Sequence, residues 1–172
     1  MKKLMLITIC LIALIGLSGC NIHTNKDGTQ ERNYQENIDT IYFSRGPAFG
    51  PSDKDTAYKF DLKNGAFYTA KLNTDDSHEL WGTTERNSDS DFEFVSDLDD
   101  DKIDNFFRQT ARHGLTNWKS SYENSSILDG SSWYIKIIFS DQTIMESYGI
   151  NKYPSTWDKV MEDFEELTGE NF

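Results

Sequence analysis

The residues that come nearest to a metal site by type and spacing are alternating aspartates near the middle of the chain. Asp97, Asp99 and Asp101 stand at the alternate positions of a calcium-binding loop. Lys102 stands where such a loop needs a glycine, and Arg108 stands where it needs a glutamate that binds through both oxygens. We therefore expect these carboxylates to stabilise the first turn of a helix, and we expect no metal ion or cofactor.

Candidate catalytic groups are sparse. The sequence contains no G-x-S-x-G elbow and no glycine-rich phosphate loop, and His78 and His113 are far apart in the sequence. A carboxylate-based hydrolase stays open as an alternative, because it would need only that acidic side chains converge with one of these histidines in a cleft. The densest acidic group is predicted to be the exposed face of the last helix: Glu162, Asp163, Glu165 and Glu166.

A loop rich in glycine and proline, residues 45–51, is the first candidate for binding. The guanidinium of Arg45, flexible glycines and Phe49 could together hold an anion or a peptide carboxylate. The alternative is an ordinary turn between two strands, with Phe49 in the core.

Aromatic side chains in the last third of the chain are the second candidate, because aromatic platforms bind sugars and peptides. Trp133 and Trp157 fall on predicted core faces. The remaining candidate binding residues, expected to be better exposed or in a turn, are Trp118, Tyr122, Asn151 and Tyr153.

The first 20 residues have the pattern of a secretory signal peptide. Lys2 and Lys3 precede an apolar run that is too short for a comfortable membrane span. The run ends in Leu17-Ser18-Gly19-Cys20, which resembles the lipobox of bacterial lipoproteins.

This resemblance implies diacylglyceryl transfer to the sulfur of Cys20 and cleavage between Gly19 and Cys20. Cys10 would leave with the leader, so no disulfide is expected in the mature chain. Two or three acyl chains at one site give stable attachment. We therefore expect a protein held by lipid on the extracytoplasmic face of the cell membrane.

The net charge of the chain disfavours some classes of binding partner. It carries 29 acidic and 17 basic side chains, a formal net charge of −12. This balance disfavours nucleic acid and offers no basic patch for anionic lipid. Residues 20–37 are almost without apolar side chains, which is typical of a flexible tether, and residues 38–172 are expected to form a single domain.

Alternation of apolar side chains predicts strands over residues 38–44, 56–62, 66–72, 79–84, 91–95, 132–140 and 143–148. The second and third are joined at Asn64-Gly65, which is predicted to supply two residues with positive φ; Tyr68, Ala70 and Leu72 then lie on one side.

Helical spacing predicts a helix over residues 99–113, with Ser96 in a capping box and Gly114 at its end, and another over residues 155–168, with Ser155 as cap and Gly169 at its end. We expect an α+β domain in which both helices pack on one face of a mainly antiparallel sheet.

The last third of the chain resembles uncharacterised small lipoproteins of Gram-positive bacteria. The resemblance covers about 55 residues and consists of a D-G-x-x-W-x-I-x-I strand, a two-residue turn and a G-x-N-x-Y-P segment before the closing helix. Gln142 stands where this pattern has a glycine, and Gly149 and Asn151 are expected in strained turn conformations. Residues 45–50 more weakly resemble an R-G-x-x-F-G loop of other small bacterial lipoproteins.

Together these features favour a membrane-anchored module that binds an envelope protein, peptide or glycan. Besides the hydrolase, an immunity or inhibitor lipoprotein that binds a basic protein partner stays open.

Overall fold

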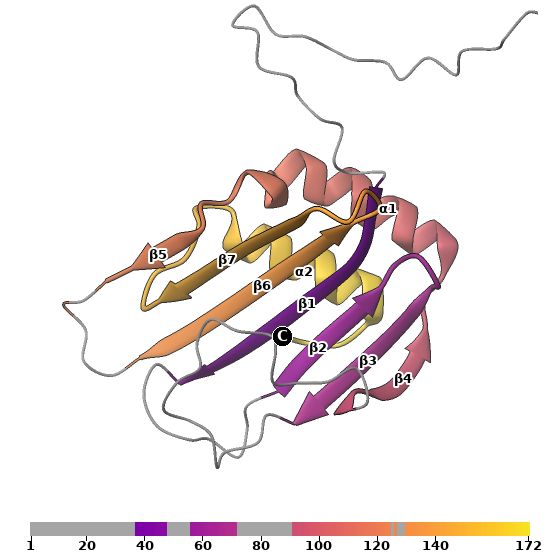
Figure 1. The fold of residues 1–172 in the computed structure, drawn as a ribbon, viewed down its shortest axis with the longest axis horizontal. Coiled ribbons are helices and arrows are strands. Elements are labelled where there is room, and N and C mark those ends of the chain that lie inside the picture. The colour runs from indigo at the N-terminus through magenta and orange to yellow at the C-terminus, as the bar shows by residue number, and fades with distance from the viewer. Residues whose placement is uncertain (1–36, 48–55, 72–90, 125, 127–129) are drawn as a thin grey trace, which may run out of the picture. The chain divides into compact units, whose positions relative to one another are not determined.

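A seven-stranded sheet organises the part of the chain that the computed structural model describes, residues 37–47, 56–71, 91–124, 126 and 130–172 (Figure 1). All of these residues belong to the second of the chain's two units, Asn33–Phe172. The strands lie in the order β4-β3-β2-β1-β6-β7-β5. Their bounds are β1 Ile38–Pro47, β2 Thr56–Asp61, β3 Ala66–Lys71, β4 Glu93–Asp97, β5 Ser121–Glu123, β6 Ser131–Phe139 and β7 Ile144–Ile150.

Neighbouring strands are antiparallel except β5 and β7, which run parallel. The predicted α+β class with a mainly antiparallel sheet is thus confirmed. The strand expected at residues 79–84 lies outside the described residues.

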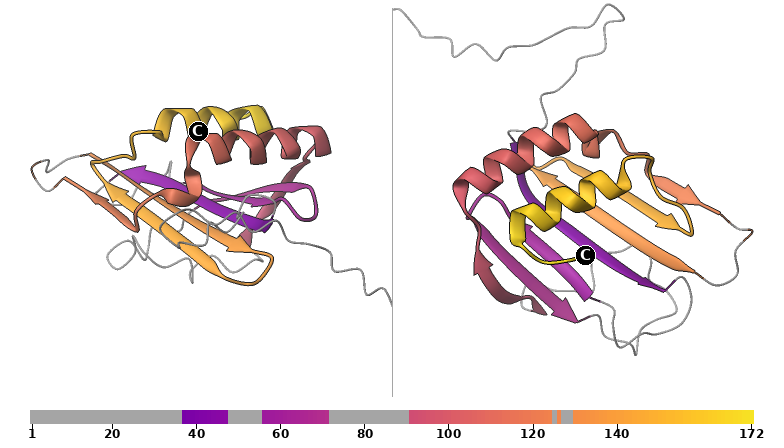
Figure 2. Two further views of the ribbon diagram at one scale, coloured as in Figure 1. Left: turned by 90° about the horizontal axis from the view of Figure 1, so that it is seen from above. Right: turned by 180° about the vertical axis from the view of Figure 1, so that it is seen from behind.

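Two α-helices of the described chain, α1 (Asp100–His113) and α2 (Trp157–Thr168), lie side by side on one face of the sheet, as predicted (Figure 2). A short 3₁₀ helix, η4 (Leu115–Asn117), follows α1. Neither α-helix has the length and apolar content that crossing a membrane requires. The opposite face of the sheet, called the open face below, has no described helix over it (Figure 1).

The predicted cap of α1 is wrong by three residues. Asp99 is the N-cap, and its side chain accepts hydrogen bonds from the backbone N–H groups of Asp101 and Lys102 at 2.9 and 3.2 Å. Ser96 is instead paired with Phe67 in the sheet, which commits its backbone to a strand. Gly114 ends the helix in a left-handed conformation, as expected.

The predicted cap of α2 is also wrong. Thr156, not Ser155, is the N-cap, and its side chain makes no capping bond. Its hydroxyl oxygen instead accepts a hydrogen bond from the indole of Trp118 at 3.1 Å. Gly169 ends α2 as predicted.

The core between sheet and helices is aromatic at its centre. Phe164 of α2 stands with its ring centroid 4.6 Å from that of Phe60, 5.0 Å from that of Phe106 and 6.0 Å from that of Phe43. All four side chains are almost completely buried, and burial of each contributes about 1.5–3 kcal/mol. This cluster holds both helices on the sheet.

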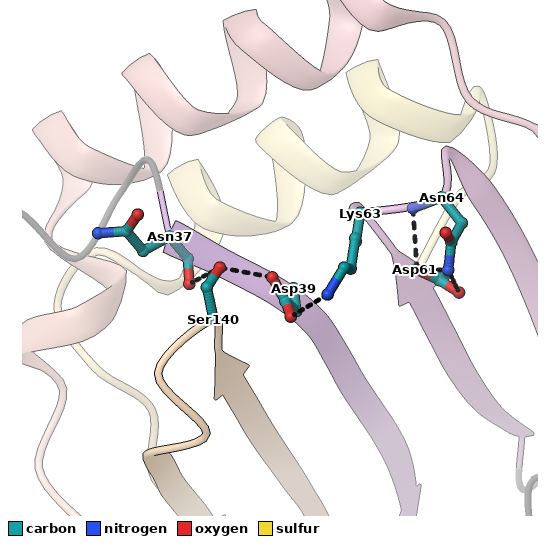
Figure 3. Close-up of polar contacts among 6 residues, drawn as sticks. All are labelled: Asn37, Asp39, Asp61, Lys63, Asn64 and Ser140. Atoms are coloured by element: carbon teal, nitrogen blue, oxygen red, sulfur yellow. Dashed lines mark hydrogen bonds and ion pairs between the residues drawn. The ribbon is translucent and has the colours of Figure 1, made fainter.

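The β2–β3 hairpin forms where it was predicted, with a different turn. Only Gly65 has a positive φ, and the turn spans four residues because Asp61 pairs with Ala66. The carboxylate of Asp61 holds Asn64 by accepting from its backbone and side-chain N–H groups (Figure 3). Phe67 lies opposite Phe60 and faces the helices. Tyr68 and Ala70 share a side, as expected, and that side is the open face; Leu72 lies outside the described residues.

Candidate binding surface

Two of the predicted binding aromatics are part of the interior. Trp118 is only 8% exposed, which contradicts its expected exposure. Its ring stacks on Trp157 and meets the edge of Trp133, with centroids 5.7 and 5.6 Å apart. Tyr122 is half-buried beside Trp133, and its hydroxyl accepts a hydrogen bond from the backbone N–H of Lys119 at 3.0 Å.

Asn151 and Tyr153 are likewise committed to internal contacts. Asn151 has φ 56, the strained turn conformation expected for it. Its side-chain oxygen accepts from the backbone N–H of Ser131 at 3.0 Å and occupies the space where a Cβ on Gly130 would stand, 1.6 Å away. The hydroxyl of Tyr153 hydrogen-bonds that of Ser131. Both side chains thus fasten the end of β7 to the start of β6.

Gly149 has a different role from the one expected. Its φ is not positive; instead it lies against the Trp133 indole, because a Cβ there would stand 2.1 Å from the indole Nε1. That Nε1 donates to the backbone oxygen of Lys152 at 2.9 Å. The residues of the C-terminal pattern therefore join β6, β7 and the start of α2.

The predicted loop at Arg45 is a strand up to Pro47, since β1 continues through this segment and pairs with both β2 and β6. Arg45 is exposed, and its guanidinium donates to the backbone oxygen of Phe172 at 3.2 Å. Phe49 and the predicted lipidation site Cys20 lie outside the described residues.

The open face carries a row of side chains that the sequence analysis missed. The pairing of the strands aligns one residue from each of six adjacent strands, so that these residues form a line across the sheet. From β7 to β4 these are Glu146, Lys136, Tyr42, Lys59, Tyr68 and Phe94. We call this set the open-face row. The alternation of polar and apolar residues in β1 and β2 was visible in the sequence, but the register that aligns the strands was not.

Aromatic and cationic groups meet within the open-face row. The ammonium of Lys59 lies 5.8 Å from the ring centroid of Tyr42 and 5.4 Å from that of Tyr68, within the range of cation–π attraction. Phe92, just before β4, sets its ring edge-on to Tyr42, and Phe94 does the same to Tyr68, both with centroids 5.8 Å apart.

The row ends in an apolar surface on β4. Phe94 is 58% exposed and Val95 is 43% exposed. A bulge between β3 and β4 leaves Val95 without a partner in the β3 register. Among the described strands, β4 pairs only with β3, so one edge of β4 offers its backbone N–H and C=O groups to an additional strand.

A hollow of about 220 Å³ lies between α1 and α2. Its lining includes the carboxylates of Asp101, Asp163 and Glu166. Asp163 is 5% exposed, and its Oδ2 lies 2.8 Å from Nδ1 of His113 in the last turn of α1. The prediction that Asp163 belongs to the exposed face of its helix is wrong. Its position three residues after Val160 and next to Phe164 was the sequence signal that it borders the apolar stripe.

Burial raises the pKa of the Asp163 carboxyl, and the neighbouring charges of Glu162 and Glu166 act in the same direction. The hydrogen bond from His113 and its charge oppose this shift. Because His113 is engaged with Asp163 on one ring nitrogen, the pair ties the end of α1 to the middle of α2.

A further cluster of polar side chains lies where β1 begins. The carboxylate of Asp39 accepts from the hydroxyl of Ser140 at 2.5 Å and pairs with the ammonium of Lys63 at 3.1 Å (Figure 3). The Ser140 hydrogen bond, aided by Lys63, lowers the pKa of Asp39 despite partial burial. Asp39 thereby connects β1 to the β2–β3 turn and to the β6–β7 turn.

In the described part of the chain, no group of three or more histidine, cysteine or acidic side chains is arranged to hold a metal ion. No family model, no curated protein and no solved structure matches the chain.

Proposed function

We propose that this chain is a lipid-anchored, extracytoplasmic binding protein that contacts an envelope protein, peptide or glycan. The observation that carries the binding half of the proposal is the exposed end of the open-face row at β4. Both described helices cover the other face, while Phe94 stands more than half exposed beside Tyr68. Exposed aromatic side chains next to a cation are typical anchors in binding surfaces.

The anchoring half rests on residues 17–20. Cys20→Ser is expected to release the protein from membranes or to block its processing, because the sulfur that accepts lipid is then absent. The measurement is fractionation of cells that express either chain, with the molecular mass of each product. A processed Cys20→Ser product that stays with the membrane contradicts anchoring at this residue.

Photo-cross-linking in intact cells tests the binding surface. A benzophenone side chain in place of Phe94 is expected to give a discrete adduct with an envelope component. The matched control carries the same group in place of Arg108, an exposed residue of α1 on the opposite face. Equal adducts from both positions, or none from position 94, contradict binding through the open face.

The hollow between α1 and α2 favours the hydrolase alternative, since Asp101, Asp163 and Glu166 line it and His113 bonds Asp163. Loss of a hydrolytic activity in Asp101→Asn, with the fold intact, would support that alternative. The acidic residues around β4 favour the remaining alternative, an inhibitor or immunity lipoprotein with a basic partner.

A further inference from the structure

We infer that the edge of β4 that pairs with no described strand binds an extended, basic segment of a partner protein by strand addition. This inference rests on the proposed binding function and specifies its partner. The occupant is argued from three properties of β4: the edge that no described strand pairs with, the exposed side chains and the charge.

β4 is the longer of the two edge strands of the described sheet. In the described sheet β4 is at one end and β5 at the other. β5 has only three residues, and its Glu123 accepts a hydrogen bond from Tyr148 of β7. β4 has five residues and is the longer edge. A strand that added there would satisfy the outward backbone groups of β4 and place alternate side chains on the open face.

The side chains supply an apolar anchor. An added strand would continue the open-face row, because its residue opposite Phe94 would lie next to the exposed ring. Phe94 already meets Tyr68 edge-on, so its ring is held in place before binding. A β-branched or aliphatic side chain of the partner would cover this ring and remove it from water.

The negative charge around β4 favours a basic partner. Residues 91–101 contain six acidic side chains and no lysine or arginine. Asp91, just before β4, and Glu93 and Asp97, within it, are all exposed. A second copy of β4 would bring like charges together, which is unfavourable across paired strands. A segment with lysine or arginine at alternate positions fits this edge, and the net charge of −12 attracts it over a longer range.

The probe is a peptide of about nine residues with alternating lysine and valine, long enough to span β4. The full-length chain in detergent micelles is expected to bind it, with slower amide exchange in Glu93–Asp97 and with weaker binding as salt increases. The same peptide interrupted by two prolines, and a peptide with glutamate in place of lysine, are expected not to bind.

Two variants and a matched control test the residues. Phe94→Ser is expected to weaken binding about tenfold or more. Ile144→Ser, which removes another exposed apolar side chain from the open face at β7, is expected to change nothing. Glu93→Lys is expected to weaken binding of the lysine peptide and to strengthen binding of the glutamate peptide.

Failure of the lysine peptide to bind overturns the inference, as does binding without new protection in β4 or equal effects of Phe94→Ser and Ile144→Ser. A concentration-dependent dimer that Phe94→Ser abolishes would assign the edge to a second copy instead. In each of these cases a cross-link from position 94 leaves the proposed binding function standing, whereas absence of that cross-link removes the function itself.

Discussion

The indole Nε1 of Trp133 donates a hydrogen bond to the backbone oxygen of Lys152, 2.9 Å away, past a residue that has no side chain, Gly149. A buried indole that lost this acceptor would keep an unsatisfied donor, which is costly. The bond closes the connection from β7 to α2 and fixes Trp133 against Trp157, whose ring centroid is 4.8 Å away.

Gly149→Ala is therefore expected to destabilise the protein by about 1–3 kcal/mol. A Cβ at this position would stand 2.1 Å from the Trp133 Nε1 and 2.5 Å from the Lys152 oxygen, so the backbone or the indole must move. Urea unfolding followed by tryptophan fluorescence measures the change. Gly169→Ala gives the cost of a positive φ alone, about 1–2 kcal/mol, since a Cβ there meets nothing within 4 Å. Gly149 has no positive φ, so an unchanged stability of Gly149→Ala would contradict the packing argument.

The sequence predicted the elements that depend on local patterns. The strong β6 pattern, the apolar stripes of α1 and α2 and the terminal glycines Gly114 and Gly169 all have periodic or positional signals, and the structure agrees with them. The binding surface was not predicted, because the open-face row exists only when six strands align. Trp118 was assigned to the surface because nothing local to it indicates that α2 covers it.

Gln142→Gly is expected to stabilise the protein by about 0.5–1 kcal/mol. Gln142 has φ 65 in the β6–β7 turn, a conformation that costs a residue with a side chain about 1–2 kcal/mol. Glycine removes this strain, but its greater flexibility in the unfolded chain offsets part of the stabilisation. The turn is held by Asp141, which accepts from the Thr143 backbone N–H and is unchanged. Thermal and urea unfolding measure the effect.

Asn151→Gly makes the contrasting case, because Asn151 also has a positive φ but its side chain bonds Ser131. The free energy of unfolding of this variant is expected to fall by about 1 kcal/mol or more, since the Ser131 N–H loses its acceptor. If both substitutions stabilise the protein, the Asn151 side chain contributes nothing to the turn.

Asp163→Asn is expected to alter the pH dependence of stability. The pKa of Asp163 is raised from its usual 3.8, chiefly by burial. The folded protein therefore holds this proton where the unfolded chain has released it, and the resulting stabilisation is present below 3.8 and is lost as pH rises through the folded value. Asparagine keeps an acceptor for His113 and does not ionise. Relative to the wild type, the variant should gain stability as the pH rises from below 3.8 through the raised pKa of the folded Asp163. Urea unfolding at a series of pH values measures this, and parallel curves would contradict it.

Asp39→Asn is expected to change the pH dependence of stability in the direction opposite to Asp163→Asn. The pKa of Asp39 is lowered from 3.8 by the Ser140 hydrogen bond first and by Lys63 next. Its carboxylate therefore stabilises the folded protein above 3.8, and this contribution is lost as pH falls through the folded value. The wild type should exceed the variant in stability at neutral pH and lose that advantage in acid.

The two partners of Asp39 should contribute unequally to its pKa. Lys63 is largely exposed, so its attraction is screened by water and salt, whereas the Ser140 hydroxyl lies 2.5 Å from the partly buried carboxylate and bonds it directly. An NMR titration of the Asp39 carboxyl is expected to show a larger rise in pKa in Ser140→Ala than in Lys63→Ala. The reverse order would mean that the ion pair, and not the hydrogen bond, keeps Asp39 ionised where β1 joins the two turns.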